Sequence, residues 1–192
     1  QLWYDSSDSE FKYKYQAYGN AWSTGNSMNT ARSLAMGFGT QTAALATGGE
    51  NPTPSYLVDT ELYDGTSWTE VNNLNTARVV GGNSGVQTSG LIFSGLLAPG
   101  ATTNITESWN GTNWTEVNDM NTGRFYLGSA GASADNTASL GFGGDPSPPS
   151  STGNTEIWNG TNWTEVNDLN TARRQLMGAG IQTSALAFGG EN

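Results

Sequence analysis

The sequence is dominated by a phrase that occurs three times with few changes. It covers residues 60–71, 106–117 and 155–166, and the last copy reads Thr-Glu-Ile-Trp-Asn-Gly-Thr-Asn-Trp-Thr-Glu-Val. A degenerate fourth copy begins near Trp22. A repeating unit of this size cannot bury its own apolar face and must stack on its neighbours. The chain is therefore predicted to be a repeat protein.

Two residue types mark the period along the chain. The tryptophans are spaced by 46 (22 to 68), 46 (68 to 114) and 49 (114 to 163) residues, and four arginines keep the same spacings. A period in this range is typical of propellers and solenoids. The marked positions are Trp22, Trp68, Trp114 and Trp163, together with Arg32, Arg78, Arg124 and Arg173.

Each repeat is predicted to contain four short strands. In the last repeat, a small-residue strand over 173–180 is followed by an apolar strand over 184–188 that stops at Gly189-Gly190. The third and fourth strands of the preceding phrase are joined by Asn159-Gly160, a dipeptide that supplies the positive φ of a tight hairpin. Each repeat therefore resolves into an antiparallel meander, and no segment keeps a helical apolar period without interruption.

These units predict an all-β propeller of four blades in a single domain over residues 1–192. The repeats run approximately over 24–71, 72–117, 118–166 and 167–192. The last repeat contains only inner strands, so residues 1–23 are predicted to supply its outer strands and close the ring, which removes exposed sheet edges. The same exchange between two molecules would instead produce a domain-swapped oligomer or a filament.

Composition excludes several functions. The net charge of −10 disfavours binding to nucleic acid or to anionic membranes, and no apolar run is long enough for membrane insertion. The sequence has no Cys and no His, which removes thiolate nucleophiles, the usual general base near neutral pH and the commonest zinc ligands. We therefore predict that the chain is not an enzyme and carries no cofactor and no metal.

The acidic residues leave two further chemistries to weigh. Calcium could bind among Asp5, Asp8, Glu10, Asp59, Asp119, Asp135, Asp145 and Asp168, but no Asp-x-Asp-x-Asp-Gly loop is present, so these are predicted to be solvated turn residues. A pair of carboxylates could serve a glycosidase. The glutamates recur at equivalent repeat positions, however, which favours a packing or surface role.

The repeated tryptophans and arginines each have two interpretations. The tryptophans could stack on sugar rings, but their strict period favours packing between blades. The arginines could surround an anionic ligand near the axis, but each is predicted instead to hold a carboxylate or backbone carbonyls of the neighbouring blade. The glutamates expected as partners are Glu70, Glu116 and Glu165.

The loops between the second and third strands differ most from repeat to repeat. They run from Glu50 to Asp59, from Leu96 to Asn104 and from Asp145 to Asn154, and all three contain proline. In a propeller such loops emerge on one face, which is predicted to be the binding face. Tyr56 is the aromatic residue expected to contact a ligand there.

The order of these marks resembles the kelch repeat: Arg after a turn, an apolar strand ending in Gly-Gly, an aromatic in the third strand and Trp in the fourth. The third-strand aromatics are Tyr63, Trp109 and Trp158, and one copy has Ser94-Gly95 in place of the glycine pair. The repeats are also similar to kelch-like repeats in structural and tail-associated proteins of marine bacteriophages.

This resemblance implies a non-catalytic structural or adhesion protein in a virion or another extracellular assembly. Its partners would be other structural subunits, including further copies in a homo-oligomer, or a host-surface protein or glycan. The alternative is a free-standing propeller that binds carbohydrate or protein, and a third reading is an enzyme acting on glycans.

Overall fold

The computed structural model describes residues 2–5, 10–13, 25–131, 136–147 and 150–192, which form strands and connections without helix. Three repeats form four-stranded antiparallel sheets, each with its strands in chain order. This confirms the prediction of an all-β chain built from meanders. The first sheet contains β3 (Met36–Thr40), β4 (Ala43–Thr47), β5 (Thr60–Tyr63) and β6 (Trp68–Val71). The second contains β7 (Gly82–Val86), β8 (Ser89–Phe93), β11 (Thr106–Trp109) and β12 (Trp114–Val117). The third contains β13 (Gly128–Ala130), β14 (Ser139–Phe142), β15 (Thr155–Trp158) and β16 (Trp163–Val166).

The last repeat forms only a two-stranded sheet of β17 (Arg174–Ile181) and β18 (Ser184–Glu191). Two further ribbons are small: β9 (Leu96–Leu97) with β10 (Ala101–Thr102), and β1 (Leu2–Asp5) with β2 (Glu10–Tyr13). The described residues contain no helix that could cross a membrane.

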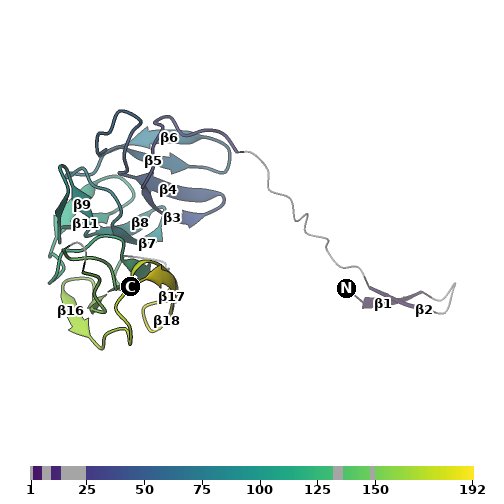
Figure 1. The fold of residues 1–192 in the computed structure, drawn as a ribbon. Coiled ribbons are helices and arrows are strands. Elements are labelled where there is room, and N and C mark those ends of the chain that lie inside the picture. Colours follow the sequence, from purple (N-terminus) through teal and green to yellow (C-terminus); the bar gives the residue numbers. More distant parts are fainter. Residues whose placement is uncertain (1, 6–9, 14–24, 132–135, 148–149) are drawn as a thin grey trace.

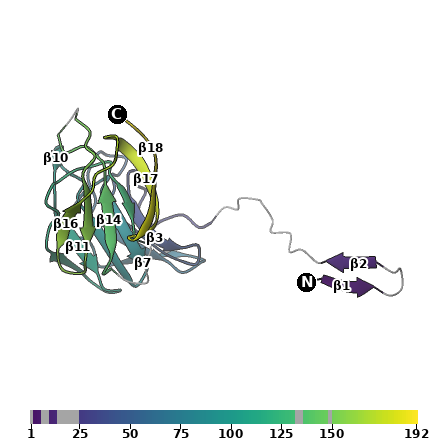
Figure 2. The same cartoon turned by 90° about the horizontal axis from the view of Figure 1, so that it is seen from below.

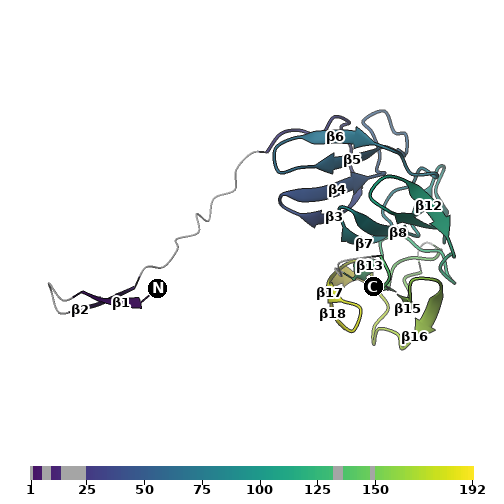
Figure 3. The same ribbon diagram turned by 180° about the vertical axis from the view of Figure 1, so that it is seen from behind.

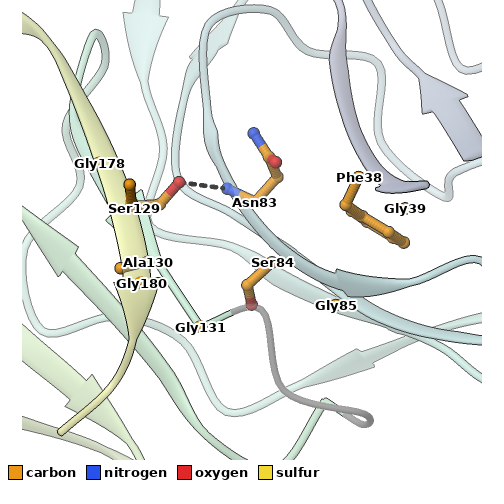
Figure 4. A pocket seen from close by; sticks show the side chains of 11 residues that line it. Phe38, Gly39, Asn83, Ser84, Gly85, Ser129, Ala130, Gly131, Gly178 and Gly180 are labelled. Atoms are coloured by element: carbon orange, nitrogen blue, oxygen red, sulfur yellow. Dashed lines mark hydrogen bonds between the residues drawn. The ribbon is translucent and has the colours of Figure 1, made fainter. Parts of the chain in front are cut away.

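The four sheets follow one another around an arc, with β3, β7, β13 and β17 as neighbouring inner strands (Figures 1 and 3). Figure 2 shows the strands of successive sheets standing beside one another. The inner strands approach closely because they are rich in glycine; a Cβ atom on Gly178 would lie 2.1 Å from the carbonyl oxygen of Ser129. All four inner strands line one cavity of about 220 Å³ (Figure 4).

A series of backbone hydrogen bonds connects the residues that lead into the inner strands. The Gln175 N–H donates to Tyr126 O (2.8 Å), the Tyr126 N–H to Val80 O (3.0 Å), and the Val80 N–H to Leu34 O (3.3 Å). All four residues have a positive φ, between 51° and 56°, which is costly for a β-branched residue such as Val80. Each repeat therefore enters the arc with the same unusual backbone conformation.

The predicted completion of the last blade is not present among the described strands. β1 and β2 pair with each other, with Leu2 opposite Tyr13, and β18 pairs only with β17. Most of the remaining N-terminal segment, including Trp22, lies outside the described residues. The sheets thus form an arc of three complete meanders and one two-stranded sheet, without a closed ring.

The core lies between successive sheets. One cluster joins the first and second sheets and contains Met36, Leu45, Leu74, Ile92, Trp109 and Trp114; a second joins the second and third sheets and contains Leu91, Phe93, Met120, Leu127, Trp158 and Trp163. Within them, the Trp114 indole N–H donates to Thr60 Oγ1 (3.1 Å) and that of Trp163 to Thr106 Oγ1 (3.0 Å). Each of these tryptophans therefore connects its own outer strand to the third strand of the preceding sheet.

Trp68 occupies the equivalent position in the first sheet, where no described sheet precedes it. It is only half-buried, and its ring packs against Tyr63 at a centroid distance of 5.0 Å.

We predict that Trp114→Ala lowers the free energy of unfolding by about 3–5 kcal/mol, as expected for a buried large side chain. Trp68→Ala should cost clearly less in the same denaturant titration. Equal losses would contradict the arrangement described above.

Candidate functional site

Three repeats contain a buried pair of an arginine and a glutamate. Arg32 Nη2 lies 2.7 Å from Glu61 Oε1, Arg124 Nη2 lies 2.9 Å from Glu156 Oε1, and Arg78 contacts Glu107 in the same way. None of these side chains is more than 1% exposed. The glutamates stand on the third strands β5, β11 and β15.

The predicted partners Glu70, Glu116 and Glu165 are therefore wrong. They lie on the fourth strands, directly opposite the paired glutamates, and are exposed to solvent. The loop that carries each arginine contacts the glutamate of the third strand, so the glutamates of the fourth strand remain exposed to solvent. The carboxylate also belongs to the arginine's own sheet; only the arginine backbone bonds to the preceding sheet, as when the Gly49 N–H donates to Arg78 O (3.0 Å).

Each buried carboxylate is surrounded by donors from one Asn-Thr-x-Arg segment, which we call a carboxylate cradle. Glu61 Oε2 accepts hydrogen bonds from the backbone N–H (2.7 Å) and the side-chain amide (3.0 Å) of Asn29. Its Oε1 accepts from the Thr30 N–H (3.0 Å) and from Arg32. The other two filled cradles repeat this pattern: Asn75, Thr76 and Arg78 around Glu107, and Asn121, Thr122 and Arg124 around Glu156.

The electrostatics of the cradle favour the ionised pair. Burial alone would raise the pKa of Glu61, but the hydrogen bonds from Asn29 and Thr30 and the charge of Arg32 outweigh it and hold that pKa below the ordinary 4.5. Burial lowers the pKa of Arg78 and Arg124, and the neighbouring glutamates oppose this shift. Because each charge is both paired and hydrogen-bonded, the burial of the pair is tolerated.

A fourth cradle, formed by Asn170, Thr171 and Arg173, has the same anchors but no glutamate. The Gly144 N–H donates to Arg173 O (2.8 Å), as the Gly95 N–H does to Arg124 O (2.9 Å). Arg173 Nη1 donates to Gly189 O (2.9 Å), as Arg32 Nη1 does to Gly48 O (2.9 Å). The last sheet has no third strand, and among the described residues no carboxylate contacts the Arg173 guanidinium.

A pocket lies at this fourth cradle, whose counterparts in the other three repeats each hold a glutamate. It measures about 190 Å³ and is lined by Leu169, Asn170, Thr171, Arg173 and Ala187. The donors of this cradle therefore face open space beside β18.

Apolar side chains are exposed next to this pocket. Leu186 is 70% exposed and Phe188 51%, whereas Leu45 and Phe142, at the equivalent positions of β4 and β14, are 1% and 2% exposed. In the complete sheets a third strand is paired beside these positions, and the side chains lie in core clusters with residues of the following sheet. We call β18 together with the fourth cradle the open blade edge.

Several acidic residues considered as calcium ligands form contacts that stabilise the fold. Asp119 Oδ1 accepts from the Thr106 N–H (3.1 Å) and Asp168 Oδ1 from the Thr155 N–H (3.2 Å), so both hold the start of a third strand. Asp145 is buried and bonds to Arg174 (3.0 Å). No group of His, Cys, Asp or Glu within the described ranges could hold a metal ion. Asp8 and Asp135, with the side chains of Asp5 and Glu10, lie outside what is described.

Two further regions are candidate ligand sites. Tyr56 is half-buried and forms a backbone bridge with Glu50; the nearby pocket, lined by Ala31, Arg32, Ser33, Glu50, Asn51 and Pro52, does not include it. The central cavity in Figure 4 is lined by small residues, Asn83 and Phe38, and no titratable side chain lines it. The three arginines of the filled cradles bind glutamates, so they do not form an axial anion site.

Sequence reasoning missed a second set of contacts between sheets. Gln87 Nε2 donates to Ala44 O (3.0 Å) and Tyr63 O (2.6 Å) of the preceding sheet. Gln182 Nε2 donates likewise to Ser139 O (3.0 Å) and Trp158 O (2.5 Å). The recurrence of Gln-Thr in the turn between the first two strands was the available signal for this role.

No family model and no curated protein matches the chain. The kelch-like character of the repeats therefore remains a resemblance in the order of residues.

The cradle geometry predicts that substituting two glutamates that face each other across one strand pair changes the free energy of unfolding by very different amounts. Glu107→Gln should lower the free energy of unfolding by about 3–5 kcal/mol, because it leaves the buried Arg78 charge without its partner. Glu116→Gln, on the exposed neighbouring strand, should change it by less than about 1 kcal/mol. Chemical denaturation of both variants checks this, and similar losses would refute the assignment.

The lowered pKa of Glu61 predicts a dependence of stability on pH. Since the folded-state value lies below the ordinary 4.5, the carboxylate contributes stability above that pH and loses it as the pH falls through the folded-state pKa. Glu61→Gln, although less stable at neutral pH, should lose less further stability on acidification. Denaturant titrations at neutral and acidic pH measure this, and an unchanged acid dependence would contradict it.

Proposed function

We propose that the chain is a four-bladed, kelch-like propeller that acts as a non-catalytic structural or adhesion module of a virion or another extracellular assembly. The observation that carries this proposal is the open blade edge. It combines unpaired strand backbone, exposed apolar side chains and a cradle without its carboxylate. Such an edge favours pairing with a further strand.

Support for four blades comes from the inner strands. One strand from each repeat lines the same cavity, and the residues that lead into these strands share one conformation and one hydrogen-bond series. A two-stranded outer hairpin is all that the last sheet lacks relative to the others. Residues 1–23 are the intramolecular candidate for this hairpin, and a strand pair from another molecule is the intermolecular one.

Support for a structural role comes from what the repeated polar residues do. The paired glutamates and the arginines of the filled cradles bond within their sheets, and Gln87, Gln182 and the indole N–H groups of Trp114 and Trp163 bond between sheets. Their chemistry is used to fix the blades relative to one another. The proposed partners are other structural subunits, copies of this chain, or a protein or glycan on a host surface.

The second candidate is a free-standing propeller that binds carbohydrate or protein. The observation that favours it is the half-buried Tyr56 in the variable segment 50–59. In this case the loops between second and third strands form the binding face, and the open blade edge is completed within the molecule.

Solution mass as a function of concentration separates these functions. We expect light scattering to give 20.2 kDa in dilute solution and a higher mass on concentration, because the open blade edges then associate. Phe188→Asp should remain at 20.2 kDa throughout. The matched variant Val166→Asp, on β16, should behave as the unchanged chain. A constant monomer at all concentrations would contradict the structural proposal and favour the binding module.

A further inference from the structure

We propose that the open blade edge binds a β-hairpin of this chain's own repeat type carried by a second polypeptide. The glutamate in its Thr-Glu-x-aromatic strand would occupy the cradle of Asn170, Thr171 and Arg173. This inference rests on the proposed function, because it names the partner that completes the unfinished blade.

The fourth cradle is already arranged for a carboxylate. Its loop is held by the Leu169 N–H, which donates to Gly153 O (2.9 Å), as the Met120 N–H donates to Asn104 O (3.0 Å) beside a filled cradle. The Arg173 guanidinium is fixed on Gly189 O, as described above. In the filled cradles the same segment supplies two backbone N–H groups, one amide and one guanidinium to a single glutamate. Binding therefore requires little ordering of the receiving loop.

The register of the complete sheets places the incoming glutamate at the pocket. On β14, Phe142 pairs with Thr155, Gly141 with Glu156, and Ser139 with Trp158. The equivalent positions of β18 are Phe188, Ala187 and Ala185, so a strand added in the same register sets its glutamate opposite Ala187. Ala187 is one of the residues that line the empty pocket. Register and pocket thus identify the same place independently.

The added strand would also cover apolar surface. Leu186 and Phe188 are exposed on β18, whereas Leu45, Leu91 and Phe142 at equivalent positions of the complete sheets are buried. Strand addition supplies backbone hydrogen bonds along the edge, while side-chain pockets select the sequence. At the open blade edge the cradle selects a strand that carries a carboxylate. An ionised carboxylate that accepts hydrogen bonds from an arginine and from backbone N–H groups is bound strongly.

The chain's own N-terminal segment lacks the required carboxylate. When Trp22 is aligned with Trp68, the residue that corresponds to Glu61 is Tyr15, and the one that corresponds to Thr60 is Lys14. Neither a neutral phenol nor an ammonium group supplies the negatively charged acceptor that the N–H donors and the guanidinium bind in the filled cradles. The complementary hairpin is therefore expected from another polypeptide.

The test uses the full chain and a synthetic peptide with the sequence of residues 154–168, titrated in dilute solution by calorimetry. We expect saturable binding of one peptide per chain. A Glu156→Gln peptide should bind at least about tenfold more weakly, because it loses the charged acceptor. A Glu165→Gln peptide, changed at the exposed glutamate of the same hairpin, is the matched control and should bind as well as the unchanged peptide.

Variants of the chain complete the design. Arg173→Gln should cause the same loss of at least about tenfold, and it should remove the difference between the unchanged peptide and the Glu156→Gln peptide. Arg174→Gln, which alters the neighbouring arginine bound to Asp145, should keep that difference. The proposal is overturned if the full chain does not bind the peptide, or if both peptides bind equally well.

These outcomes are separable from the proposed function. A chain that self-associates but shows no glutamate-dependent peptide binding would retain the structural role and overturn this inference. A chain that remains monomeric at all concentrations, yet binds the peptide through Glu156, would support the inference while contradicting the self-associating assembly.

Discussion

The buried pair of an arginine and a third-strand glutamate is the interaction on which the rest of the structure depends. The arginine side chain closes its own sheet from the inner to the third strand, while its backbone carbonyl accepts a hydrogen bond from the glycine turn of the preceding sheet, as Arg78 does with Gly49. One residue thus connects the strands of its own sheet and attaches that sheet to the preceding one. Leaving either charge unpaired in the interior would be costly, so each sheet depends on its arginine loop for stability.

The other repeated contacts reinforce the same joint. Trp114 and Trp163 bond to threonines of the preceding sheet, and Gln87 and Gln182 cap strand ends there. Every one of these contacts requires a complete neighbour. Where no described sheet adjoins them, Trp68 is only half-buried and Phe188 is 51% exposed. The surface available to a partner is therefore a consequence of the repeat itself, and the chemistry of that surface is the chemistry of the interior contacts.

The sequence was sufficient for the strands and insufficient for the contacts between distant segments. The third strand over 60–63 and its hairpin were predictable, because Asp64-Gly65 strongly favours a tight turn between two β-rich runs. The partner of Arg78 was not predictable. Glu107 and Glu116 lie opposite each other on adjacent strands, and the sequence does not show which of the two the loop that carries Arg78 contacts. Ser94 shows the same limit: it takes a φ of 63° where other repeats use glycine, and its hydroxyl accepts from the Arg124 N–H, a compensation visible only in three dimensions. Whether residues 1–23 close the ring depends on long-range pairing that no local pattern specifies.

Amide hydrogen exchange of the dilute chain tests the central claim most directly, because each cradle reports on itself through two backbone N–H groups. The filled cradle at Asn121 and Thr122 donates these groups to Glu156, so both should be strongly protected. The corresponding N–H groups of Asn170 and Thr171 face the empty pocket and should exchange rapidly. Equal, strong protection in both cradles would show that a carboxylate already occupies the fourth one, and would contradict the open blade edge.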